Sequence, residues 1–311
     1  MEINYPENFE NYIVDEINNI LDYETIGNKI SEMTYLERKF LNVIIRQVKP
    51  KKILEIGVAA GGGSSIILNA IKDIDNSLLY SIDYSKKFYR DKHKNSGFII
   101  EEKFPHLLAK WKLYTGGVAA KFIDEIGGNI DLCLLDAMHS NPGEILDFLM
   151  ILPYLDKNAV IVIHDIFTSN TCLTLFNSMK GKKVIFKDKD EIFNNYGIGA
   201  VILDDNIMDY IFDYFFLLKL NWNYMPSDAD IETVIELFKK HYSKDLINFF
   251  IKVSNINKKN FYIHSHMNKE INKINKISWW IPFKKMRGKF KEKKMLEIEK
   301  NIKEIRYFNI N

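Results

Sequence analysis

The stretch ILEIGVAAGGGSS, residues 53–65, decides the fold class of this 311-residue chain. It leads from a short apolar segment, residues 52–56, through a glycine-rich turn into a predicted helix over residues 64–74. Glycines at such a turn let the backbone approach a ligand closely, and the N-terminus of the following helix helps to hold polar groups. Because Ala59 stands two positions after Gly57, the spacing G-x-G-x-x-G of dinucleotide-binding turns is absent.

Further apolar segments alternate with predicted helices along the next 150 residues or so. Continuous apolar strands of this kind are typical of a mostly parallel sheet covered by helices on both faces. The pattern therefore predicts an α/β fold with a doubly wound, seven-stranded sheet, whose last two strands pair antiparallel through a short connection at residues 194–196. The later strands are expected at residues 78–82, 111–114, 132–135, 159–163, 183–186 and 198–203.

Three regions are expected. Residues 1–49 form a helical segment, in which Thr34 and Glu37 are spaced as a capping box and which Pro50 ends. Residues 50–205 form the α/β domain. Residues 206–311 form a helical extension that begins with aromatic and amphipathic segments and ends in a basic, aromatic tail.

The composition is that of a soluble globular protein, with 47% hydrophobic and 27% charged residues and a net charge of +2. Cys133 and Cys172, the only cysteines, have the spacing of neither a disulfide framework nor a zinc site. The acidic, polar start is unlike a signal peptide, and no apolar stretch approaches the roughly 20 residues of a membrane span. We therefore expect a cytoplasmic protein.

Glu55, Gly57 and Gly61 give the spacing E-x-G-x-x-x-G, which resembles motif I of class I S-adenosylmethionine-dependent methyltransferases. The second strand ends at Asp83, where a carboxylate can accept both hydroxyls of a ribose; a helix cap or turn residue is the alternative. The loop LYTGGVAA, residues 113–120, resembles the one beside the adenine in that family. The resemblance implies binding of S-adenosylmethionine by a set comprising Glu55, Gly57, Ala59, Gly61, Ser65, Asp83, Gly116 and Asp136.

Acids and histidines follow the fourth and fifth strands. Asp136 ends the fourth, His139 comes three residues later, and His164 and Asp165 end the fifth. Carboxyl ends of adjacent strands face one crevice, so these side chains should converge. Two carboxylates suit Mg²⁺ or another divalent cation, and a nearby imidazole can accept a proton. The alternative is that both acids cap helices and that His139 is a solvated turn residue.

This layout resembles the metal-dependent O-methyltransferases of the catechol type, and more closely the macrocin-type sugar O-methyltransferases. The resemblance implies that Asp136 and Asp165 hold the metal and that His139 is the base. Relatives often place two metal-binding side chains side by side after the fifth strand, whereas His164 and Ile166 flank Asp165 here. A third ligand is therefore not assigned, and His164 stays open as a second catalytic base, a ligand or a packed spectator.

The segment 279–294 combines aromatic and cationic side chains. Indole rings suit the membrane–water interface and lysines favour anionic headgroups, which predicts a peripheral contact with the inner membrane face. Packing of the tryptophans on the main domain stays open, and nucleic acid is not the expected partner although such a segment can hold phosphates. Its WWIPFKK stretch resembles the ends of bacterial enzymes that decorate capsular or lipopolysaccharide sugars.

The leading hypothesis is methyl transfer from S-adenosylmethionine to a hydroxyl of a sugar or surface-glycan precursor, assisted by a metal. Two alternatives stay open: a metal-independent N- or O-methyltransferase of small molecules, and a cofactor-binding subunit without activity in a membrane complex. The first hypothesis predicts dependence on a divalent cation, the second predicts activity in chelator, and the third predicts cofactor binding without turnover. A homo-oligomer is compatible with the sequence, which does not specify the oligomeric state.

Overall fold

A computed structural model describes residues 33–186 and 197–307. The first 32 residues of the predicted N-terminal segment and the predicted connection at residues 194–196 lie outside this described part.

A seven-stranded sheet with the order β3-β2-β1-β4-β5-β7-β6 forms the centre of the first part of the chain. The first five strands pair in parallel, and β7 runs antiparallel to both β5 and β6, which confirms the predicted antiparallel end of the sheet. The strands are β1 (Lys52–Ile56), β2 (Leu78–Asp83), β3 (Trp111–Thr115), β4 (Ile130–Leu135), β5 (Leu155–Ile163), β6 (Gly181–Phe186) and β7 (Ile198–Leu203).

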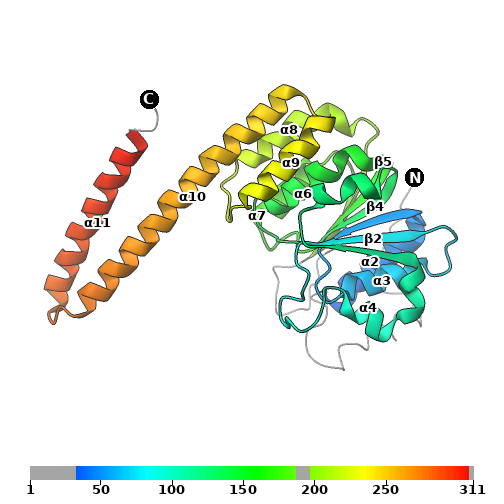
Figure 1. The fold of residues 1–311 in the computed structure, drawn as a ribbon, viewed down its shortest axis with the longest axis horizontal. Helices are drawn as coiled ribbons and strands as arrows, with labels where there is room; N and C mark the ends of the chain where they lie inside the picture. Colours follow the sequence, from blue (N-terminus) through cyan, green and yellow to red (C-terminus); the bar gives the residue numbers. More distant parts are fainter. Residues whose placement is uncertain (1–32, 187–196, 308–311) are drawn as a thin grey trace. The chain divides into compact units, whose positions relative to one another are not determined.

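Helices cover both faces of this sheet (Figure 1). On one face lie α2 (Tyr35–Val48), α3 (Gly62–Ile71), α4 (Phe98–Lys103) and η3 (Pro105–Lys110). On the other lie η4 (Ala119–Lys121), α5 (Ile123–Ile126), α6 (Gly143–Ile151), η5 (Leu152–Tyr154), α7 (Asn170–Ser178), η6 (Ile207–Tyr210), α8 (Ile211–Phe216), η7 (Leu217–Lys219) and α9 (Asp228–His241). The predicted doubly wound α/β fold is therefore confirmed.

The central strands are apolar throughout because both of their faces are covered. Successive side chains of a strand point to opposite faces. Leu132 and Leu134 of β4 pack into the core with α2 and α3, while Cys133 between them is equally buried. This is why the sequence shows continuous apolar runs rather than alternation.

The helix before the sheet begins and ends as the sequence predicts. Thr34 caps α2, and its capping box with Glu37 is complete in both directions. Lys49 ends the helix in the left-handed conformation directly before Pro50. The carboxylate of Glu37 is buried at this point, and it reaches the functional site described below.

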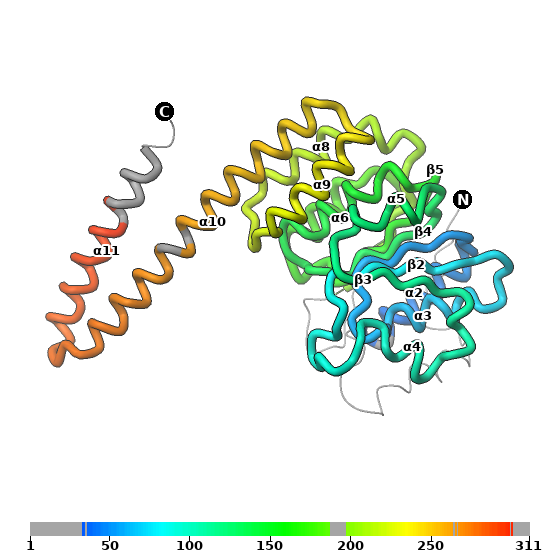
Figure 2. Tube along the Cα trace, in the orientation of Figure 1, coloured from blue at the N-terminus to red at the C-terminus, as the bar shows by residue number. Residues whose placement is uncertain are grey.

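The described residues divide into two compact units, one ending at Phe250 and one beginning at Ile251. The helices α10 (Lys244–Trp279) and α11 (Lys284–Tyr307) complete the chain (Figure 2). The domain boundaries expected at residues 49 and 205 stay predictions, since one compact unit can contain several functional segments. No described helix combines the length and the apolar run that crossing a bilayer requires.

Candidate functional site

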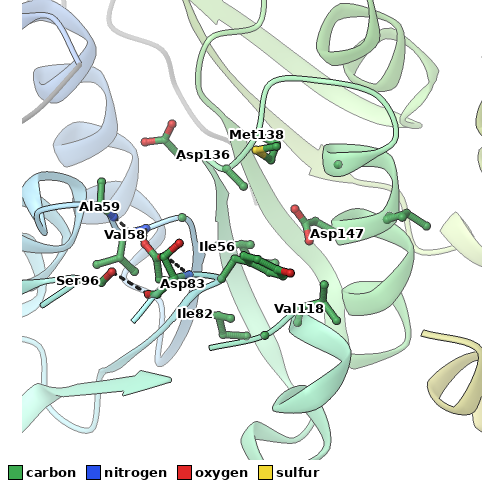
Figure 3. A pocket seen from close by; sticks show the side chains of 18 of the residues that line it. Ile56, Val58, Ala59, Ile82, Asp83, Ser96, Val118, Asp136, Met138 and Asp147 are labelled. Atoms are coloured by element: carbon green, nitrogen blue, oxygen red, sulfur yellow. Dashed lines mark hydrogen bonds between the residues drawn. The ribbon is translucent and has the colours of Figure 1, made fainter. Parts of the chain in front are cut away.

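A cavity of about 660 Å³ opens at the carboxyl ends of β1, β2 and β4 (Figure 3). This volume is within the range of small-molecule sites, roughly 300–1,000 Å³. Of the residues predicted to bind cofactor, Glu55, Gly57, Ala59, Asp83 and Asp136 line it. Gly61, Ser65 and Gly116 do not: Gly61 caps α3, the Ser65 hydroxyl donates to the carbonyl of Gly62, and the neighbouring Gly117 takes the place expected for Gly116.

The turn after β1 requires glycine at position 57. Gly57 has φ +94°, and a Cβ built on it would lie 1.9 Å from the carbonyl oxygen of Asp136. Asp136 follows β4, the strand next to β1, so the close approach of two backbones brings the glycine-rich turn to the predicted reactive acid. Any larger residue would separate them.

Asp83 holds the same turn from the other side. Its Oδ2 accepts hydrogen bonds from the backbone N–H groups of Val58 (3.1 Å) and Ala59 (2.9 Å), while Oδ1 accepts one from Ser85 (2.8 Å). Figure 3 shows this carboxylate beside the cavity. Oδ1 retains a further acceptor site, which suits it to receive a hydroxyl donor.

Glu55 lies beneath the turn and is fully buried. Its Oε2 accepts hydrogen bonds from the hydroxyls of Ser64 and Ser81, both at 2.6 Å. Burial outweighs these hydrogen bonds and raises the pKa of Glu55 to about 8. The acid of the E-x-G-x-x-x-G pattern therefore ties the start of α3 to β2.

The structure brings all four predicted reactive side chains together. Nε2 of His139 lies 3.4 Å from Oδ1 of Asp136 and 3.4 Å from Oδ2 of Asp165. The rings of His139 and His164 meet edge to face with centroids 6.0 Å apart. Asp136 and His139 line the cavity, whereas His164 and Asp165 stand behind them.

His164 is enclosed by carboxylates. Its Nδ1 is 2.9 Å from Oδ1 of Asp136, and its Nε2 is 3.3 Å from Oε2 of Glu37. Burial would lower the pKa of His164, but the charge of Asp136 and the hydrogen bonds to Asp136 and Glu37 raise it well above its usual value. Burial would raise the pKa of Asp136. The charge of His164 and its hydrogen bond nevertheless hold the pKa of Asp136 below the usual value.

Glu144 lies behind His139. It is 1% exposed, accepts a hydrogen bond from the backbone N–H of His139, and places Oε1 3.6 Å from Nδ1 of that ring. Burial raises the pKa of Glu144 against the opposing charge of His139. Nδ1 of His139 is buried and has no hydrogen-bond partner among the described residues.

Three residues of the site adopt positive φ without being glycine: Ala59 at +51°, His139 at +47° and Asp165 at +54°. Such conformations cost about 1–3 kcal/mol each and persist where the surroundings enforce them. Their concentration around one cavity agrees with a functional role for it.

The far end of the cavity is built by α6 and by the segment from Tyr224 to Val234. Asp147 projects from α6 opposite Val58 and Ala59 (Figure 3). Burial, together with the charge of Glu144, raises the pKa of Asp147 well above its usual value. Tyr84 also lines the cavity and donates a hydrogen bond to Asp230 of α9 at 3.1 Å.

The sequence prediction of binding and catalytic residues does not include Glu37, Glu144, Asp147, Tyr224 or the lining residues of α9. Glu37 was recognised only as a capping residue, since its distance of 127 positions from His164 gives no local signal. Glu144 and Asp147 carry no motif, and only their place on an apolar helix marks them as unusual. The lining by Tyr224 and α9 depends on long-range packing.

The site contains candidate ligands for a divalent cation. One carboxylate oxygen of Asp136 and one of Asp165 each lie 3.4 Å from Nε2 of His139, and Oδ1 of Asp165 is buried without a hydrogen-bond partner among the described residues. The ligand atoms of Asp136, His139 and His164 lie within 4.8 Å of one another. Asp136 is the one hard oxygen donor in that group, and Asp165, the second predicted ligand, would add another.

Residues 54–166, which contain the glycine-rich turn and all four reactive side chains, match a family model described as a methyltransferase domain. This part of the chain therefore resembles a methyltransferase domain. The matched residues include the glycine-rich turn, the end of β1 and the strands β2 to β5, while β6, β7 and α9 lie outside them.

Solved structures similar to the chain include an O-methyltransferase from Bacillus cereus in complex with SAH, at 15% identity and a TM-score of 0.47, covering 61% of this chain and 91% of that one. The O-methyltransferase TomG from Streptomyces achromogenes has 13% identity and a TM-score of 0.45, covering 61% and 91%. The methyltransferase PaMTH1 from Podospora anserina has 17% identity and a TM-score of 0.45, covering 62% and 89%. Comparison with proteins of curated function finds no match.

Proposed function

We propose that this chain transfers the methyl group of S-adenosylmethionine to a hydroxyl oxygen, with a divalent cation at Asp136 and Asp165 and with His139 as the base. The observation that carries the proposal is the position of Nε2 of His139, 3.4 Å from a carboxylate oxygen of each acid, at the edge of a cavity lined by the glycine-rich turn.

The cofactor would lie across the cavity. Its ribose hydroxyls would donate to Asp83, and its sulfonium end would lie along Gly57 and Ala59 toward Asp136. The adenine base would reach the far end, between Val118 and Met138, where the carboxyl group of Asp147, whose pKa burial raises, would face the adenine edge.

His139 would take the proton. An Nδ1–H directed at Glu144 would leave the lone pair on Nε2, beside Asp136 and Asp165, to accept a proton. The acceptor hydroxyl gives its proton to Nε2, its oxygen forms the new bond to the methyl carbon, and the carbon–sulfur bond breaks with its electron pair left on sulfur. The products are the methyl ether, S-adenosylhomocysteine and an imidazolium at His139.

The other charged groups would position this pair. Imidazolium His164, held by Glu37, donates to Asp136 and fixes its orientation. A divalent cation held by Asp136 and Asp165 would lower the pKa of the acceptor hydroxyl and help to orient it. We propose a sugar or surface-glycan precursor as acceptor, on the basis of a histidine base beside two acids, the arrangement of the sugar O-methyltransferases that the sequence resembles.

The test measures transfer of a radiolabelled methyl group from S-adenosylmethionine to a panel of nucleotide sugars and lipid-linked glycan precursors. We expect a methylated sugar product in Mg²⁺ and its loss in EDTA, with recovery when Mg²⁺ is restored. Turnover that persists in EDTA would contradict the proposed requirement for a divalent cation. Tight binding of S-adenosylhomocysteine with no turnover on any hydroxyl, amine or thiol acceptor would contradict the enzymatic proposal.

A further inference from the structure

The second compact unit carries the two most exposed large hydrophobic side chains among the described residues. Trp279 is 74% exposed and Trp280 is 84% exposed. Phe283 and Met286 follow at 67% and 60%, so that four large apolar side chains lie uncovered within eight positions. Apolar surface concentrated in this way marks an interaction site rather than ordinary surface variation.

The backbone beneath these side chains is ordered. Arg287 of α11 donates two hydrogen bonds, of 3.2 and 2.9 Å, to the carbonyl of Ile281 in the turn between α10 and α11. Its guanidinium also lies 5.6 Å from the ring centre of Trp279. The turn is therefore closed by polar contacts, while its rings stay uncovered.

Positive charge surrounds the turn. Residues 276–294 contain eight cationic residues and one acid, Glu292. The cations are Lys276, Lys284, Lys285, Arg287, Lys289, Lys291, Lys293 and Lys294. The chain as a whole has a net charge of only +2, so this excess is local.

We propose that the α10–α11 turn, residues 279–286, together with the adjacent cationic residues, docks on an anionic lipid surface. Indole and phenyl rings favour the interface between headgroups and acyl chains, and lysine and arginine favour anionic headgroups. The proposed contact is peripheral. This inference concerns the second unit alone and does not depend on the proposed methyl transfer.

The mixture of aromatic and non-aromatic side chains exposed around the α10–α11 turn favours a lipid over a nucleic acid as the partner. Base stacking uses aromatic faces, whereas Ile277 and Met286, 56% and 60% exposed, add aliphatic and thioether surface beside the rings. A bilayer accepts all of these side chains together. A second copy of the chain would have to cover eight like charges at the same place, which opposes self-association.

Tryptophan emission provides the test in the full-length protein. The chain has four tryptophans; Trp222 is buried and Trp111 is half-buried, so Trp279 and Trp280 dominate any response to an added surface. We expect a blue shift and co-sedimentation with vesicles of phosphatidylcholine and phosphatidylglycerol, weakened by high salt, and neither effect with phosphatidylcholine alone.

Two pairs of variants sharpen the result. Trp279→Ser with Trp280→Ser should abolish the shift, and Lys284→Glu with Lys285→Glu should weaken vesicle binding at least about tenfold. The matched control makes the same charge change at exposed lysines of the first unit, Lys157→Glu with Lys182→Glu, and should bind vesicles like the unmodified chain. All six positions are exposed, and circular dichroism checks that each variant folds.

Three results would overturn the proposal. One is the absence of binding to either kind of vesicle. The second is equal loss of binding in the Lys284/Lys285 pair and the control pair, which would reduce the contact to net charge. The third is saturable binding of single-stranded RNA that depends on the two tryptophans, without any vesicle binding.

Discussion

Asp83 and Asp136 end the two strands that flank β1, yet their surroundings make them different groups. Asp83 accepts three backbone N–H groups and meets no cationic side chain within ion-pair distance among the described residues. Asp136 lies between two imidazoles, 2.9 Å from His164 and 3.4 Å from His139. The position of an acid at the end of a strand therefore does not define its role. The groups around it decide whether it is suited to bind the cofactor, as Asp83 is, or belongs to the histidine cluster, as Asp136 does.

The largest effect is expected at the reactive end. His139→Ala should lower turnover by about 10²–10⁴-fold, because it removes the proton acceptor. Binding of S-adenosylhomocysteine should change less than threefold or so, since the ring lies at the edge of the cavity. Methyl-transfer kinetics and calorimetry on the same preparation measure both. If cofactor binding fell in proportion to turnover, the Asp136 end of the cavity would not differ in role from the Asp83 end.

A smaller effect is expected one step behind the base. Glu144→Gln keeps the size of the side chain and an oxygen that can accept the N–H of His139, but removes the carboxylate facing Nδ1. We expect kcat to fall about 10–100-fold with little change in KM for either substrate. An equal loss of thermal stability and of kcat, with KM raised, would indicate a structural role alone.

The sequence predicts the strands, the glycine-rich turn and the four acids and histidines, but not the residues that reach the site by long-range packing. Strand positions and the glycine-rich turn follow from local patterns, because apolar runs and a glycine at φ +94° leave a signature within a few residues. Asp136, His139, His164 and Asp165 were found because two adjacent strands deliver their ends to one place. Glu37 and α9 reach the site only through packing across more than a hundred positions of sequence, which no local spacing encodes.

The binding end gives the next prediction. Asp147→Ala should weaken S-adenosylhomocysteine about 3–10-fold, the range of one or two hydrogen bonds, while kcat at saturating cofactor stays within about twofold. Isothermal titration and saturation kinetics measure the two quantities. Unchanged affinity would remove Asp147 from the adenine site and leave the far end of the cavity to another ligand.

The smallest effect concerns stability. Because the pKa of Glu55 is about 8 in the fold against 4.5 as its ordinary value, the unfolded state loses this proton first. The stability that Glu55 contributes is therefore complete below about pH 4.5 and is lost as pH rises through 8. Glu55→Gln cannot ionise, so its Tm relative to the unmodified chain should rise by about 5–10 °C between pH 6 and pH 9.

The control for that variant is Glu101→Gln, which makes the same change at an exposed position. Its Tm relative to the unmodified chain should be independent of pH over this range. If Glu55→Gln behaves in the same way, the carboxyl group of Glu55 is not protonated in the fold.

The central claim is that the cavity binds the cofactor through Asp83, and calorimetric titration of S-adenosylhomocysteine tests it most directly. Asp83→Asn keeps an acceptor for the backbone of the turn but removes the charge. Its matched control is Asp131→Asn, since Asp131 accepts the N–H groups of Lys51 and Lys52, both at 2.7 Å, away from the cavity. We predict one site per chain, weakened at least about tenfold by Asp83→Asn and unchanged by Asp131→Asn. No binding to the unmodified chain, or equal affinity of both variants, would contradict the account.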